Sequence, residues 1–306
     1  MTAREKLMAE AAKRILITDG AFGTEIQNWK LDEAAYAGDL GLSHDQKGNN
    51  DILALTRPEV PASIHRAYFE AGADIAETNT FSANRISQAD YGAEHLVHAI
   101  NYESAKMART IADEFEAKDG RPRFVAGALG PTNKTLSLSP DVNDPGYREI
   151  DFDHLKDVYR EQIDALVEGG IDFVLIETVF DTLNAKAGIM AAIEAGEALG
   201  RDLPIMLSMT LTDLSGRNLS GHTVEAFWHA VRHARPVTIG LNCSFGAEQL
   251  RPHVKTLSNL CDTLIMVYPN AGLPNALGPY DQAPATTAGL VRALALPAPV
   301  NVLRPS

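Results

Sequence analysis

A single thiol stands where a buried strand is expected to turn towards solvent. Residues 237–243 read Val-Thr-Ile-Gly-Leu-Asn-Cys, and the β-branched residues that begin this run predict a buried strand. The residues from Gly240 to Gly246 suit a loop better than a core. Cys243 is therefore placed to do chemistry. The alternative is that Cys243 is a small hydrophobic residue, which is the usual role of an isolated cysteine.

Acids and amides follow several other short apolar runs in the same way. For any one of them the alternative role is a turn or cap residue. As a set around one thiol, they favour a polar site for a small molecule. These strand-end residues are Asp19, Glu77, Asn79, Glu177, Asn242, Cys243 and Asn270.

The order of the apolar runs predicts how these side chains come together. Eight predicted strands alternate with stretches of helical period, which is typical of a parallel sheet covered by helices. This pattern over 306 residues favours an α/β fold of the (β/α)₈ TIM barrel type, as a single domain over residues 1–306. An open doubly wound sheet is less favoured, because no G-x-G-x-x-G follows the first strand. In such a barrel the carboxyl ends of the strands converge on one mouth. The predicted strands are residues 15–21, 74–81, 123–130, 172–178, 204–210, 237–243, 263–270 and 300–303, with long loops at 28–55 and 132–149.

Composition excludes several classes of partner. The net charge of −13 argues against nucleic acid or an anionic membrane, since both require a basic face. Two cysteines, Cys243 and Cys261, do not form a disulfide scaffold and fit a reducing compartment. No N-terminal signal core and no apolar run long enough to span a bilayer is found. We therefore predict a cytoplasmic location.

Several motifs in one order along the chain resemble a known family. These motifs are residues 19–24 (Asp-Gly-Ala-Phe-Gly-Thr), 50–53 (Asn-Asp-Ile-Leu), 77–81 (Glu-Thr-Asn-Thr-Phe), 127–132 (Gly-Ala-Leu-Gly-Pro-Thr), 177–181 (Glu-Thr-Val-Phe-Asp), 240–244 (Gly-Leu-Asn-Cys-Ser) and 268–275 (Tyr-Pro-Asn-Ala-Gly-Leu-Pro-Asn). With them, the chain resembles the homocysteine-binding module of cobalamin-dependent methionine synthase, within the homocysteine S-methyltransferases, from about residue 15 to about residue 280.

The resemblance implies a reaction. Homocysteine would be converted to methionine, with a zinc ion keeping its sulfur as a thiolate. The methyl donor would be methylcobalamin carried by a separate cobalamin-binding polypeptide, because this chain has no Asp-x-His-x-x-Gly corrinoid motif.

The resemblance also implies roles for individual residues. Cys243 matches the first zinc ligand, and Asn270 matches the asparagine that fills the open zinc position before substrate arrives. Glu177 would accept hydrogen bonds from the substrate ammonium group. The remaining substrate contacts, with backbone N–H groups of the first turn facing the carboxylate, would come from Asp19, Gly20, Ala21, Phe22, Asn79 and Asn242.

The match fails after the last predicted strand. The family continues there into Gly-Gly-Cys-Cys-Gly, which supplies two further zinc ligands, whereas this sequence reads Arg304-Pro305-Ser306. We therefore expect an eighth unit that is incomplete at the C-terminus and an incomplete zinc site. Cys261 is expected to be a core cysteine at the opposite end of the barrel. Three interpretations stay open: a truncated or frameshifted methyltransferase, a methyltransferase that takes ligands from a partner chain, or a degenerate, non-catalytic barrel that binds an amino acid or thiol.

Overall fold

The computed structural model describes residues 1–271, 282–295 and 300–304, and it forms one eight-stranded parallel barrel. The strands are hydrogen-bonded in the order β1-β8-β7-β6-β5-β4-β3-β2, and a bridge between Thr18 and Ile75 joins the two ends of this order. The (β/α)₈ prediction is thus confirmed. The strands are β1 (Leu16–Ile17), β2 (Ile75–Glu77), β3 (Phe124–Leu129), β4 (Phe173–Val179), β5 (Ile205–Met209), β6 (Thr238–Gly246), β7 (Leu264–Asn270) and β8 (Val302–Leu303).

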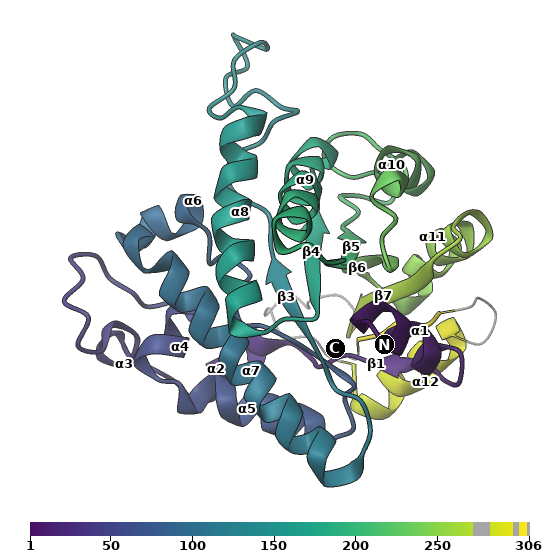
Figure 1. The fold of residues 1–306 in the computed structure, drawn as a ribbon. Coiled ribbons are helices and arrows are strands. Elements are labelled where there is room, and N and C mark those ends of the chain that lie inside the picture. The colour runs from purple at the N-terminus through teal and green to yellow at the C-terminus, as the bar shows by residue number, and fades with distance from the viewer. Residues whose placement is uncertain (272–281, 296–299, 305–306) are drawn as a thin grey trace.

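Helices lie outside the strands and alternate with them along the chain (Figure 1). Two segments predicted without helices carry short ones, namely the N-terminal residues and the loop at 28–55. The loop at 132–149 contains no helix or strand and projects beyond α8 at the top of Figure 1. The α-helices are α1 (Ala3–Ala11), α2 (Phe22–Asn28), α3 (Glu33–Ala37), α4 (Leu53–Thr56), α5 (Glu59–Glu70), α6 (Arg85–Gln88), α7 (Val97–Asp119), α8 (Phe152–Gly169), α9 (Thr182–Leu199), α10 (Val224–Val231), α11 (Ala247–Leu260) and α12 (Pro284–Ala295).

Alternate residues of each strand enter two different cores. Phe124, Phe173 and Leu175 belong to a cluster that fills the barrel, while Val125 and Val174 belong to the larger cluster packed under the helices. Both faces of each strand are therefore apolar, as expected for parallel strands covered on both sides. None of the described helices is long and apolar enough to cross a membrane.

Strand β6 extends further than its sequence predicts. The residues from Gly240 to Gly246 suit a loop by their types, but β6 pairs with β7 through Gly246, with a shift in register after Asn242. Cys243 at this irregularity has a φ of 59°, which allows the chain to kink and pair again. Gly240, opposite Met266, leaves no room for a side chain, because a Cβ there would lie 1.8 Å from the Met266 carbonyl oxygen.

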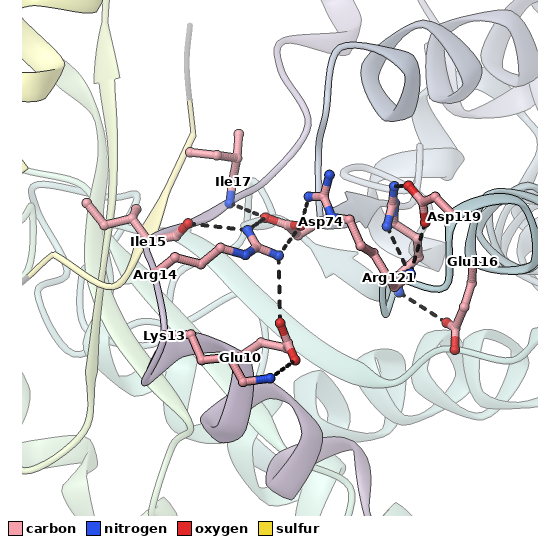
Figure 2. A network of polar contacts seen from close by, with 10 residues as sticks. Glu10, Lys13, Arg14, Ile15, Ile17, Asp74, Glu116, Asp119 and Arg121 are labelled. Atoms are coloured by element: carbon pink, nitrogen blue, oxygen red, sulfur yellow. Dashed lines mark hydrogen bonds and ion pairs between the residues drawn. The ribbon is translucent and has the colours of Figure 1, made fainter.

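A charged network holds the first two strands together at their amino ends (Figure 2). Both oxygens of the buried Asp74 accept hydrogen bonds from Arg14, at 2.7 and 2.8 Å, and one also accepts from Arg121 at 2.8 Å. The backbone N–H of Ile17 donates to the same carboxylate at 2.9 Å. Burial raises the pKa of Asp74, but these donors outweigh it and hold the pKa below its ordinary value. The network therefore stabilises the barrel at the end away from the polar strand ends.

Replacing Asp74 with asparagine tests this network. The amide keeps the size of the side chain but leaves two guanidinium groups without their anion. Because both arginines are partly exposed, we expect the free energy of unfolding to fall by about 2 kcal/mol. Urea unfolding measures the change, and Asp202→Asn, which breaks the exposed Arg4–Asp202 pair, is the matched control. Equal, small losses in the two variants would contradict the role given to Asp74.

Candidate active site

A cavity of about 780 Å³ opens at the carboxyl ends of the strands. It brings together residues from the ends of β2, β4, β6 and β7 and from the segment after β8. Most of the residues predicted from the sequence line it: Ala21, Phe22, Asn79, Glu177, Asn242, Cys243 and Asn270. Asp19 and Gly20 are buried next to it and are not part of its wall.

Three carboxylates and one guanidinium meet at this cavity. Arg304 Nη1 donates to Glu77 Oε2 at 2.6 Å and lies 3.9 Å from Glu177 Oε2. Arg304 Nη2 donates to the carbonyl oxygen of Gly20 at 2.7 Å. The guanidinium carbon also lies 5.1 Å from the centre of the Tyr268 ring, within the range of a cation–π contact. Arg304 is thus fixed by an acid, a carbonyl and an aromatic ring.

The third carboxylate, that of Asp19, lies behind those of Glu77 and Glu177. The backbone N–H of Glu77 donates to Asp19 Oδ2 at 2.8 Å. The other oxygens of this pair, Asp19 Oδ1 and Glu77 Oε1, are buried and have no hydrogen-bond partner among the described residues. Buried acceptors without donors are costly.

Burial and mutual repulsion alter how these acids ionise. Burial, followed by the charge of Glu77, raises the pKa of Glu177 to about 8, although Arg304 opposes the shift. The pKa of Asp19 is raised for the same reasons. Glu177 therefore favours the protonated form at neutral pH when no ligand is present.

Asn242 fixes the ends of β4 and β6 against each other. Its Oδ1 accepts hydrogen bonds from Thr178 N at 3.1 Å and Ser208 Oγ at 2.7 Å. Its Nδ2 donates to Thr178 Oγ1 at 2.7 Å and to Cys243 Sγ at 3.2 Å. Thr178 and Cys243 both have φ near +60°, which is uncommon for residues other than glycine. The observed role of the Asn242 side chain is to position Thr178 and Cys243. A contact between Asn242 and a substrate stays a prediction.

The two thiols occupy different environments, as the sequence predicts. Cys243 is exposed at the cavity, while Cys261 follows α11 and packs, half-buried, against the core under the helices. Burial raises the pKa of both thiols, that of Cys261 to about 12. Cys243 is therefore the thiol that a ligand can reach, and it is protonated at neutral pH.

The outer wall of the cavity comes from the loop that precedes α4. Asn79 Nδ2 donates to the carbonyl oxygen of Asn50 at 2.7 Å, which ties this loop to the end of β2. Asp51 accepts from the backbone N–H of Ser82 at 3.1 Å, and burial raises its pKa to about 7. These contacts hold the Asn50-Asp51 motif against the end of β2, where it forms part of the cavity wall.

The described residues do not fit a zinc site. Cys243 and Asn270 line the same cavity, but no group of three His, Cys, Asp or Glu side chains in the described part of the chain could hold a metal ion. Tetrahedral zinc takes four ligands, of which catalytic sites supply three from protein. The donor set is too small, and Arg304 already places a permanent cation in this cavity.

Sequence reasoning missed two members of the site as binding residues, Glu77 and Arg304. Glu77 is one of the strand-end acids that the sequence places at the mouth, so a signal for it exists. Arg304 directly follows the last predicted strand, but nothing in its local sequence points to a partner 227 residues away. The segment 272–275 of the motif after Tyr268 lies outside the described residues.

Comparisons with known proteins agree with this fold. The family described as homocysteine S-methyltransferase matches residues 16–302. The metallated form of the Escherichia coli homocysteine methyltransferase MmuM superposes with a TM-score of 0.72 at 22% identity, over 98% of this chain and 94% of that one. The oxidized form gives 0.71 at 21% identity, over 95% and 90% of the chains, and the apo form gives 0.64 at 21%, over 95% and 89%.

Proposed function

Because the chain belongs to the homocysteine S-methyltransferase family, we propose that it binds L-homocysteine in the cavity at the strand ends and presents the sulfur for methyl transfer, giving methionine. The observation that carries this proposal is that Glu177 and Cys243 line the same cavity, next to the buried acid Asp19. An acid for the ammonium group and an exposed thiol in one cavity match the two ends of a thiol amino acid.

The proposed pose follows from the chemistry of each group. The ammonium group lies at Glu177, which lines the cavity, with the buried acid Asp19 behind the wall. The carboxylate faces the backbone of the turn at residues 19–22. The sulfur then points towards Cys243, whose protonated thiol donates a weak hydrogen bond to it. A bound homocysteine held at both ends is oriented for attack, which is the main contribution a site of this kind makes.

The reaction needs a donor that the chain does not hold. The sulfur forms the new bond to the methyl carbon, the bond between donor and methyl breaks, and its electron pair stays with the donor while the thiol proton leaves to solvent. We propose methylcobalamin on a separate cobalamin-binding polypeptide as this donor, on the strength of the motif that begins at Tyr268. We propose no step through zinc, because the described donor set does not fit it.

The proposal is tested by supplying purified protein with L-homocysteine and methylcobalamin and measuring methionine by mass spectrometry. Cys243→Ala should lower the rate at least about tenfold, because alanine removes the thiol that donates to the substrate sulfur. Cys261→Ala, at the other end of the barrel, is the matched control and should keep the wild-type rate. Equal rates in both variants would remove Cys243 from the reaction.

A second candidate function is an amino acid or thiol-binding barrel without chemistry. The position of Arg304 among the acids favours it, since this is a departure from the family pattern. Tight homocysteine binding without methionine formation from methylcobalamin would support this candidate over the first.

A further inference from the structure

Arg304 neutralises a cluster that would otherwise be wholly acidic. Asp19, Glu77 and Glu177 are each at most 6% exposed, and carboxylates this close repel one another in a poorly solvated site. The described titratable groups around them are Tyr68, Tyr268, Cys243 and Arg304, and Arg304 is the one cation among these. The guanidinium is therefore what allows some of these acids to keep a negative charge.

The guanidinium is held in one geometry. Its two terminal nitrogens bind different partners, Glu77 and the Gly20 carbonyl, which come from the ends of β2 and the turn after β1. Tyr268 from β7 supports the flat face. A planar group fixed on three sides loses little freedom when a ligand arrives, so it acts as a built-in part of the site.

Arg304 also leaves acceptors free. It uses Glu77 Oε2, whereas Glu77 Oε1 and Asp19 Oδ1 stay buried without a donor. Glu177 lines the cavity 3.9 Å from the guanidinium. The Glu177 carboxylate can receive N–H groups of an ammonium ion while Arg304 remains in place. With one cation beside three carboxyl groups, the cavity can take a second cation, and an ammonium ion suits it better than a metal ion, for which the described residues do not provide three ligands.

We propose that Arg304 supplies the fixed positive charge of this site and lets it bind a thiol amino acid without a metal ion. This inference rests on the proposed function for the identity of the ligand. Arg304 is a positioning residue, since it organises the acids and does not touch the reacting atoms.

The experiment compares homocysteine binding with and without a chelator. Isothermal titration of the full chain with L-homocysteine under reducing conditions should give the same Kd, within about twofold, before and after EDTA treatment. Protein equilibrated with zinc and then dialysed should retain less than about 0.1 zinc per chain by elemental analysis. Arg304→Met should weaken binding at least about tenfold, and Arg304→Lys, which keeps the charge, should recover most of it.

Matched controls separate this role from a loss of structure. Arg160→Met removes an arginine that pairs with Asp164 on α8 and does not line the cavity, and it should bind homocysteine like the wild type. Circular dichroism and thermal melting show that each variant is folded. If Arg304→Met does not fold, the comparison of Arg304→Lys with wild type and the chelator result still decide the inference.

The outcomes distinguish this inference from the proposed function. Stoichiometric zinc, with homocysteine binding lost at least about tenfold on chelation, would overturn the inference and leave the proposed function intact. Unchanged binding in folded Arg304→Met would also overturn it. No homocysteine binding in any form, with or without added zinc, would overturn the proposed function and this inference with it.

Discussion

Replacing Glu177 with glutamine is expected to weaken homocysteine binding about 30-fold, which corresponds to about 2 kcal/mol. Glu177 is buried, lines the cavity and accepts no hydrogen bond from Arg304, whose Nη1 lies 3.9 Å from Glu177 Oε2. The glutamine keeps its shape but carries no charge for the ammonium group. Isothermal titration near pH 8 measures the loss. Glu168→Gln, an exposed residue on α8, is the control and should bind normally.

The same substitution should make the ligand-free protein more stable at alkaline pH. The folded-state pKa of Glu177 is about 8, above its ordinary value of 4.5, so the folded protein holds a proton that the unfolded chain releases. The stability linked to this proton is fully present below about pH 4.5, declines as the pH rises and is lost by about pH 8. Glutamine does not titrate and removes this loss. Thermal melting at pH 5 and pH 8 should therefore show a gain for Glu177→Gln only at pH 8, and a gain at both values or at neither would contradict the assignment.

Replacing Gly240 with alanine is expected to lower the free energy of unfolding by at least about 3 kcal/mol, enough to reduce the yield of folded protein. The added Cβ would lie 1.8 Å from the Met266 carbonyl oxygen, and this obstacle is backbone in the paired strand β7, so it cannot rotate away. Separating the strands would disturb the β6 end that carries Asn242 and Cys243. Soluble yield and the urea midpoint measure the effect.

The control for this prediction is another glycine in open space. Gly289 lies exposed in α12 with nothing within 4 Å of a Cβ placed there. Gly289→Ala should stabilise the protein slightly, by up to about 1 kcal/mol, because alanine favours helix. A Gly240→Ala protein that unfolds at the wild-type urea concentration would show that β6 and β7 can move apart at little cost.

The sequence predicts the barrel well because parallel strands are buried on both faces. Runs such as residues 173–176 are apolar throughout, and each of the eight predicted runs overlaps an observed strand. The end of β6 was harder to predict, because glycine and asparagine normally indicate a turn. Here they permit a close strand approach at Gly240 and an irregular pairing after Asn242. The short helices between residues 28 and 55 depend on contacts with the rest of the chain, which a local pattern does not contain.

The sequence predicts most of the residues that line the candidate site, but it does not predict the hydrogen bonds and ion pairs between them. Strand-end acids and amides must converge in a barrel, so Glu177, Asn79 and Cys243 could be placed at one mouth from their positions alone. Whether a side chain faces the cavity or a neighbour depends on distances between strands. For this reason the sequence does not predict that Asp19 lies behind the wall or that the Asn242 amide donates to Thr178. The sequence also does not predict that Arg304 pairs with Glu77.

The Asp74 network has a consequence for how this chain tolerates change. The first two strands are joined at the base by charges that make no contact with the mouth. The closure between β1 and β2 at this end therefore does not depend on which polar groups line the opposite rim. The rim can carry an arginine in place of other groups without any change in the contacts that join these two strands.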